Sequence, residues 1–116
     1  MAMTEKTRKS KNSKETERMA RISSAFKALS NETRLAVFEN IRLGQCKESL
    51  DEKNRPSVCC VASNFDISLS TISHHLKELR NAKLIDCERK GQSIFCQPNE
   101  DTVKMMIEYL TSVMKK

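Results

Sequence analysis

Five cysteines are the side chains of this 116-residue chain that are best suited to chemistry. Thiolates are preferred ligands of soft ions such as As(III), Cd(II), Pb(II) and Hg(II), and paired thiols can also be oxidised to a disulfide. Because the number is odd and the N-terminus has no apolar signal-peptide core, we expect reduced thiols in a cytoplasmic protein rather than a disulfide framework. The five thiols are those of Cys46, Cys59, Cys60, Cys87 and Cys96.

The spacing of the cysteines leaves several interpretations open. Cys59 and Cys60 are adjacent, so on a regular helix they point about 100° apart and converge only if the helix end unwinds. Cys87 and Cys96 lie on two predicted strands and face each other in one hairpin register. Each cysteine is also small and apolar enough to be an ordinary core residue. A redox sensor would need two of them close enough to form a disulfide.

A polar helix face over residues 68–82 is the second chemically distinctive feature. Four apolar residues, from Leu69 to Leu79, recur at spacings of three, four and three and predict one apolar stripe of an amphipathic helix. Ser68 stands where an N-cap belongs. Small hydroxyls at the start of the helix, with cations further on, suit insertion into a DNA major groove. The candidate DNA-contacting residues on this helix are Ser70, Thr71, Ser73, His74, His75 and Lys77.

The elements on either side of this helix complete a DNA-binding unit. A short helix over 58–65 and a tight turn at 66–68 precede it, which is the helix-turn-helix order. Strands at 84–89 and 93–96 follow, joined at Gly91, which can supply the positive φ of a hairpin turn. We interpret this hairpin as a wing. Two basic residues at its tip, Arg89 and Lys90, are further candidate DNA contacts.

Three longer helices are predicted outside this unit. They cover residues 14–29, 32–44 and 100–114, and the middle one is expected to turn Leu35, Phe38 and Ile41 inward. The first and last carry more apolar surface than so small a domain can bury, so we expect a homodimer. The predicted fold is mainly α (α+β), a winged helix-turn-helix with a two-stranded wing and terminal dimerisation helices. Residues 1–12 are predicted to be a basic disordered arm and residues 13–116 one domain.

The charge balance favours a nucleic-acid partner. The formal net charge is +6, which points to a polyanion such as double-stranded DNA. No apolar run is long enough to cross a membrane. Cys60 and His74 could in principle pair as nucleophile and base, but no glycine-rich loop, carboxylate pair or metal triad accompanies them. We therefore expect a DNA-binding protein and not an enzyme.

Three segments resemble one family closely. Residues 28–35, ALSNETRL, are similar to the "ALADPTRL" motif of the ArsR/SmtB family of bacterial metal-responsive repressors. Residues 69–85, LSTISHHLKELRNAKLI, resemble its "SQSTVSHHLKxLRxAGLV" block, and 89–92, RKGQ, resemble its "RxGR" wing tip. The resemblance covers about residues 25–97 in the right order. It implies a homodimer that binds operator DNA and releases it when an inducer binds.

The resemblance also implies where an inducer would bind, but this sequence departs from the family's pattern at that place. The helix over residues 68–82 corresponds to the DNA-reading helix of the family, called the reading helix below. The arsenite and cadmium sensors of the family carry a Cys-Val-Cys box in the short helix before it, and the two cysteines of the box fall on Ser57 and Cys59. A further cysteine used by some arsenic sensors falls on Ala62. The box is therefore incomplete, although Cys60 adds a neighbouring thiol. A zinc site of the kind found on the family's terminal helix is not expected, because Asp101 has no histidine partner there.

We therefore predict a repressor released by a soft metal(loid), As(III) first, with no obligatory cofactor. Its ligands would be Cys59, Cys60 and Cys46, with Cys87 or Cys96 as the alternative third thiolate. A Cd(II), Pb(II) or Hg(II) sensor is one alternative. A repressor on the same scaffold that senses oxidant or persulfide is another, and a repressor with vestigial cysteines is a third.

Overall fold

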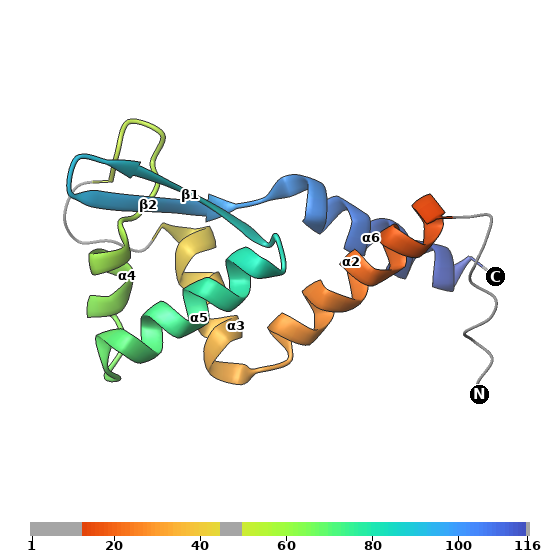
Figure 1. Ribbon diagram of the computed structural model, residues 1–116, viewed down its shortest axis with the longest axis horizontal. Coiled ribbons are helices and arrows are strands. Elements are labelled where there is room, and N and C mark those ends of the chain that lie inside the picture. Colours follow the sequence, from red (N-terminus) through yellow and green to blue (C-terminus); the bar gives the residue numbers. More distant parts are fainter. Residues whose placement is uncertain (1–12, 45–49, 116) are drawn as a thin grey trace.

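The computed structural model describes residues 13–44 and 50–115 of the protein. The predicted basic arm over residues 1–12 and Cys46 lie outside the described residues. The elements, drawn in Figure 1, are α2 (Ser13–Leu29), α3 (Glu32–Leu43), α4 (Val58–Ser63), α5 (Leu69–Asn81), β1 (Ile85–Lys90), β2 (Ser93–Pro98) and α6 (Glu100–Met114). This order confirms the winged helix-turn-helix. The predicted bounds are close to those observed. They differ for α4, which ends at Ser63 rather than at residue 65, and for β2, which ends at Pro98 rather than at residue 96.

Side-chain caps define where four of the helices begin. The side chains of Asn31, Ser57, Ser68 and Asn99 accept hydrogen bonds from backbone N–H groups in the first turns of α3, α4, α5 and α6. Such a cap satisfies a donor that the helix itself leaves without a partner. At the other end of α3, Gly44 takes the left-handed conformation with φ of 62°, and its backbone N–H donates to the Asn40 and Ile41 carbonyls, which ends the helix.

The core lies between α2, α3, α5 and the wing. Its most deeply buried large side chains include Ile41, Ile72, Leu79 and Leu84. The wing is a two-stranded antiparallel sheet whose turn contains Gly91 with φ of 64°. β2 also bonds to the segment before α4, because Cys96 N–H donates to the Pro56 carbonyl at 3.1 Å. The wing is therefore attached to the first helix of the helix-turn-helix.

The prediction that Leu35 turns inward is wrong. Its side chain is 46% exposed, whereas Val37 and Ile41 are buried at 0% and 2% exposure. Val37 and Ile41 are four residues apart and share a helix face, while Leu35 lies about 200° around the helix from Val37. The face of α3 that packs against the core therefore contains Val37 and Ile41, and Leu35 lies on the opposite face.

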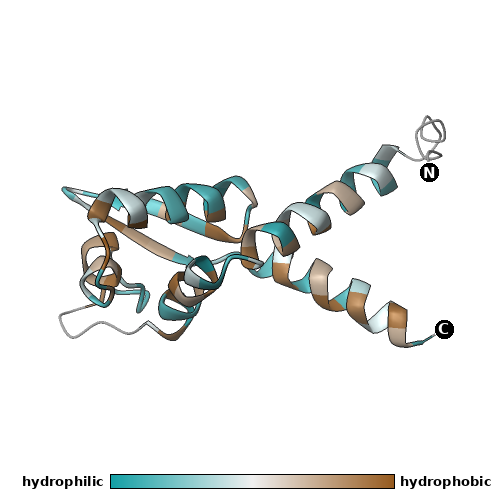
Figure 2. Cartoon of the chain, turned by 90° about the horizontal axis from the view of Figure 1, so that it is seen from below, coloured by the Kyte–Doolittle hydropathy of each residue, from teal (hydrophilic) through white to brown (hydrophobic). Residues whose placement is uncertain are grey.

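Helices α2 and α6 project together from the body of the molecule and splay apart toward their free ends (Figures 1 and 2). Arg21 Nη2 donates to the buried Thr102 Oγ1 at 2.7 Å, and Arg18 pairs with Glu108 at 3.1 Å. Phe26 and Tyr109 meet edge to face, with ring centroids 6.4 Å apart. Beyond these contacts the outer part of α6 keeps large apolar side chains in solvent: Ile107, Leu110, Val113 and Met114. No helix within 13–44 or 50–115 is long and apolar enough to span a bilayer.

Candidate DNA-binding surface and cysteine sites

The reading helix α5 begins in a cluster of hydroxyl groups. Ser68 Oγ accepts from Thr71 N–H at 3.1 Å and lies 2.8 Å from Thr71 Oγ1 and 3.2 Å from Ser70 Oγ. These contacts fix the first turn of α5 and leave the hydroxyls at the protein surface, since all three residues are exposed. Hydroxyls at an exposed helix N-terminus can serve as donors and acceptors for base edges or phosphates.

One face of α5 presents most of the predicted contact residues to solvent. The exposed members are Ser70, Thr71, Ser73, His74 and Lys77. His75 differs from the prediction, because it is only 7% exposed. It lies three residues after Ile72 and four before Leu79, so it belongs to the buried stripe of the helix, and this spacing could have revealed its position. Its side chain is therefore not available to a base edge.

Arg34 holds His75 in place from α3. Its Nε donates to His75 Nδ1 at 3.3 Å, and its Nη1 donates to the Ala28 carbonyl at 3.3 Å. Burial, the Arg34 charge and the neighbouring His74 lower the pKa of His75 below its ordinary value. His75 is therefore kept neutral, with Nδ1 as an acceptor. This role of Arg34 was not predicted, although the residue lies in the ALSNETRL segment.

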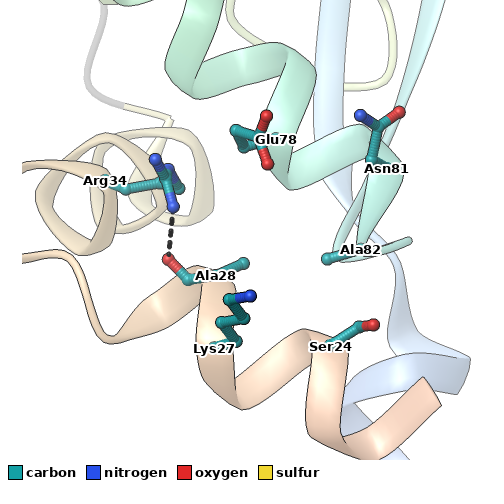
Figure 3. Close-up of a pocket in the computed structure, with 7 residues that line it drawn as sticks. All are labelled: Ser24, Lys27, Ala28, Arg34, Glu78, Asn81 and Ala82. Atoms are coloured by element: carbon teal, nitrogen blue, oxygen red, sulfur yellow. Dashed lines mark hydrogen bonds between the residues drawn. The ribbon is translucent and has the colours of Figure 1, made fainter. Parts of the chain in front are cut away.

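The same arginine borders a hollow of about 250 Å³ between α2, α3 and the back of α5 (Figure 3). Figure 3 shows Arg34 with its hydrogen bond to Ala28 on one side and Glu78 and Asn81 of α5 on the other. Lys27 and Glu78 bring opposite charges to the lining. The lining is therefore mixed in charge. Arg34 at its edge links three helices, because this residue of α3 bonds to Ala28 of α2 and to His75 of α5.

The two basic residues of the wing tip lie in different surroundings. Arg89 is exposed. Lys90 is half-buried: its Nζ pairs with Glu52 and lies 3.4 Å from Asp51 Oδ2 and 6.0 Å from the centre of the Phe95 ring. The hydrogen bond with Glu52 is the main reason that the pKa of Lys90 is raised. Lys90 is thus partly neutralised within the protein, and Arg89 carries the freer positive charge at the wing tip.

A buried ion-pair network anchors the wing to the loop before α4. Arg55, 4% exposed, pairs with Asp51 at 2.7 Å and with Glu88 of β1 at 2.9 Å. Burial alone would raise the pKa of Asp51, but hydrogen bonds from the Arg55 side chain, the Arg55 and Lys53 backbones and Lys90 hold it well below its usual range. This network was not predicted, because its members come from a loop and a strand that are distant in sequence.

Cys59 and Cys60 point in different directions on α4, as expected for adjacent helical residues. Cys59 is exposed and its thiol is free, whereas Cys60 is 7% exposed and disulfide-bonded. The prediction of reduced thiols is therefore corrected at Cys60. Among the described residues, no group of three or more Cys, His, Asp or Glu side chains is arranged to hold a metal ion. The predicted third ligand, Cys46, lies outside the part of the chain that the structure describes.

Cys87 and Cys96 do face each other across the wing. They are register partners in the β1–β2 ladder, and their Sγ atoms are 2.8 Å apart. The hydrogen bond from Cys96 lowers the pKa of the Cys87 thiol, and the nearby Arg80 guanidinium of α5 also lowers it, against the effect of burial. The same hydrogen bond and burial raise the pKa of Cys96. The strand register, which the sequence left open, therefore pairs Cys87 with Cys96. Both thiols are free.

Sequence comparison with known proteins shows which family this chain belongs to. The sequence model described as "Bacterial regulatory protein, arsR family" matches residues 48–86, which contain α4 and α5. The transcriptional activator HlyU of Vibrio cholerae is 33% identical over 85 residues, which are 73% of this chain and 69% of that protein. The chain belongs to the ArsR family of bacterial regulatory proteins. Because the ArsR family consists of transcriptional regulators, this chain is a DNA-binding regulator and not an enzyme.

Two further comparisons agree with this family assignment. The arsenical resistance operon repressor of Bacillus subtilis is 29% identical over 92 residues, covering 78% of this chain and 79% of that protein. The structure of an ArsR-like transcriptional regulator from Rhodococcus sp. RHA1 superimposes with a TM-score of 0.67 at 21% identity, covering 84% of this chain and 82% of the other. The first is a similarity over most of both sequences, and the second is a similarity of fold.

Proposed function

We propose that this ArsR-family protein is a cytoplasmic, homodimeric repressor that binds operator DNA through α5 and the wing. The observation that carries the proposal is the solvent-facing set of hydrogen-bonding side chains on α5. Arg89 extends this surface with an exposed positive charge on the wing. Side chains of this kind read base edges in the major groove, and a charge beside them contacts phosphate.

A second copy of the chain would supply the other half of the DNA-binding surface. The outer face of α6 leaves Ile107, Leu110 and Val113 at least half exposed. Burial of apolar surface drives association, and closed homodimers are the commonest soluble oligomers. Two reading helices related by a two-fold axis would bind half-sites about one helical turn apart.

Selection of binding sites from random duplex DNA, followed by footprinting, tests this function. We expect an imperfect inverted repeat with two protected half-sites. Sedimentation at micromolar protein should give a dimer. A monomer that enriches no sequence would refute the proposal.

We further propose As(III) as the inducer, bound by reduced Cys59 and Cys60 with Cys46 as the third thiolate. Three observations support a thiol site here: the adjacent pair on α4, the partial match to the family's cysteine box, and the similarity to a repressor of arsenical resistance. The helix that carries both thiols leads into the turn before Ser68, so drawing the thiolates together would tilt α5. Cys87 or Cys96 remains the alternative third ligand, and Cd(II), Pb(II) and Hg(II) are alternative ions.

The disulfide state of Cys60 sets a condition on this test. A cysteine binds these ions as a thiolate and not as part of a disulfide, so the protein must be reduced before titration. Operator release is then followed by fluorescence anisotropy while As(III), Cd(II), Pb(II), Hg(II) or Zn(II) is added separately. We expect As(III) to release the operator at the lowest concentration and Zn(II) to be ineffective.

Two observations favour a second candidate function, a repressor that responds to oxidants or persulfides. Cys60 is disulfide-bonded, and Cys87 and Cys96 are in contact. Release of the operator by peroxide but by no ion would favour this candidate over As(III) sensing.

A further inference from the structure

The pair Cys87–Cys96 occupies the position in the wing where a cross-strand disulfide fits. In an antiparallel ladder, opposite residues alternate between hydrogen-bonded and non-hydrogen-bonded pairs. Asn99 N–H donates to the Leu84 carbonyl, so Leu84 and Asn99 form a hydrogen-bonded pair. Counting along the register from that pair makes Cys87–Cys96 a non-hydrogen-bonded pair.

The other contacts of Cys96 agree with this count. Its backbone N–H donates away from β1, to the Pro56 carbonyl at 3.1 Å. Non-hydrogen-bonded partners have Cα atoms about 4.5 Å apart, which lies within the range that a disulfide spans. The observed Sγ–Sγ distance of 2.8 Å means that a bond would form with little movement of either strand.

The two thiols differ in exposure. Cys96 is fully buried, and Cys87 is part exposed beside the Arg80 side chain. A cation next to a part-exposed thiol favours the thiolate, which is the nucleophile in thiol oxidation. Cys87 is therefore the sulfur that a small oxidant would reach first, and Cys96 is the thiol positioned to react with the product.

The pair also lies where the wing joins both helices of the DNA-binding unit. Arg80, beside Cys87, is in the last turn of α5, and Cys96 bonds to Pro56 just before α4 begins. A covalent link between the strands would fix the wing in one arrangement relative to α4 and α5.

We propose that Cys87 and Cys96 form a peroxide-sensitive dithiol whose intrachain disulfide weakens operator binding. The oxidation itself does not depend on the proposed function, and only its effect on the operator rests on it. This site is separate from the proposed As(III) site on α4, apart from the alternative ligand role of these cysteines.

The chemistry balances with a hydroperoxide as the oxidant. The Cys87 thiolate attacks one peroxide oxygen, the O–O bond breaks, Cys87 becomes a sulfenic acid, and the leaving oxygen takes a proton to become an alcohol or water. The Cys96 sulfur then attacks the Cys87 sulfur. The S–O bond breaks, and the hydroxyl leaves as water with the Cys96 proton. Two electrons pass from the dithiol to the peroxide.

Trypsin offers a direct test, because it cleaves after Arg89 and Lys90, between the two cysteines. Reduced full-length protein is treated with hydrogen peroxide, its remaining thiols are alkylated, and the digest is analysed without reductant. Cys87 lies in the peptide 84–89 and Cys96 in the peptide 91–104. We expect these two peptides to be joined in the oxidised sample and separate in the reduced sample. Separately alkylated peptides, or Cys87 joined to any other cysteine, would overturn the proposal.

Operator anisotropy on the same samples tests the regulatory effect. Oxidation should weaken operator binding roughly tenfold, within the usual range of coupling between two sites, and reductant should restore it. Cys87→Ser should lose both the peptide link and the response, and because Cys87 is part exposed this variant is expected to fold. Cys96→Ala provides the same test at the buried partner. Ser93→Ala, at an exposed residue of the same hairpin, should retain both.

The two readouts separate the possible failures. A peptide link without any change in operator affinity would overturn the regulatory effect and leave the dithiol chemistry standing. If the reduced protein selects no operator, the proposed function fails, and the peptide link still decides whether the dithiol exists.

Discussion

Arg34 Nε donates a hydrogen bond to His75 Nδ1 at 3.3 Å, so a residue of α3 contacts a buried histidine of α5 directly. The bond requires an unprotonated Nδ1, and burial disfavours a second charge beside Arg34. The adjacent His74 is exposed and is free to contact DNA. Two neighbouring histidines of the same motif therefore have different roles, one structural and one on the candidate DNA-binding surface.

The stability of the protein should fall as the pH drops below the ordinary histidine value of 6.5. The pKa of His75 is lower in the folded protein than in the unfolded chain. Below pH 6.5, His75 therefore binds a proton more readily in the unfolded chain, which favours unfolding. The His75 contribution is present above 6.5 and is lost as the pH falls toward the lower folded value. Thermal unfolding at about pH 7.5 and about pH 5.5 measures this. His75→Gln should reduce the pH dependence; a pH dependence of the same size in this variant would contradict the assignment.

The exposed face of α5 should carry sequence specificity. Ser73→Ala or His74→Ala should each weaken binding to the selected operator by about 1–3 kcal/mol and should affect random DNA little, because base-edge contacts are lost. Competition binding with operator and random duplexes measures the specific and the non-specific affinity of each variant. His75→Ala is the matched comparison: it should lower the melting temperature while the folded fraction keeps its base preference. A change in base preference caused by His75→Ala would show that this side chain reaches the DNA after all.

The wing tip should supply a phosphate contact, mainly through Arg89. Arg89→Ala should weaken specific and non-specific binding alike and reduce the slope of log K against log salt by about one. Lys90→Ala should have a smaller effect on the slope, since Glu52 and Asp51 already pair with Lys90. Anisotropy titrations across a range of salt concentrations compare the two variants. A larger slope change for Lys90→Ala than for Arg89→Ala would mean that Lys90 leaves its carboxylates on binding DNA.

Dimerisation should depend on the outer face of α6. Leu110→Asp places a charge on a surface that we expect to be buried between two chains, and it should produce a monomer with much weaker operator binding. Lys104→Asp changes the charge of the same helix at an exposed residue outside that apolar row and is the control. Sedimentation velocity distinguishes the two oligomeric states. A dimeric Leu110→Asp variant would place the interface on another surface.

Release by As(III) should depend on α4. In reduced protein, Cys59→Ser and Cys60→Ser should each abolish ion-induced release while the ion-free variants still bind the operator. A coupling of roughly 1–3 kcal/mol would change operator affinity by up to about a hundredfold, and operator DNA must weaken As(III) binding by the same factor. Release that survives in the double variant would move the site to Cys87 and Cys96. Isothermal titration with and without operator tests the reciprocity.

Local features of the sequence were sufficient to predict the order of the elements. The apolar repeat of α5, the cap at Ser68 and the positive φ at Gly91 depend on residues within a few positions of one another. Helix periodicity, caps and tight turns are formed by backbone hydrogen bonds of short range, so these residues alone determine them. The motif that contains α5 also pointed to the correct family.

The tertiary structure decided which side chains of that framework are available. His74 and His75 are the same residue type, and only the packing of α5 against the core exposes one and buries the other. The charge of Lys90 is partly cancelled by carboxylates from a loop far away in sequence. Contact between Cys87 and Cys96 required one strand register among several. These properties depend on contacts between segments that only the folded chain brings together, because burial and charge pairing are set by neighbours in space.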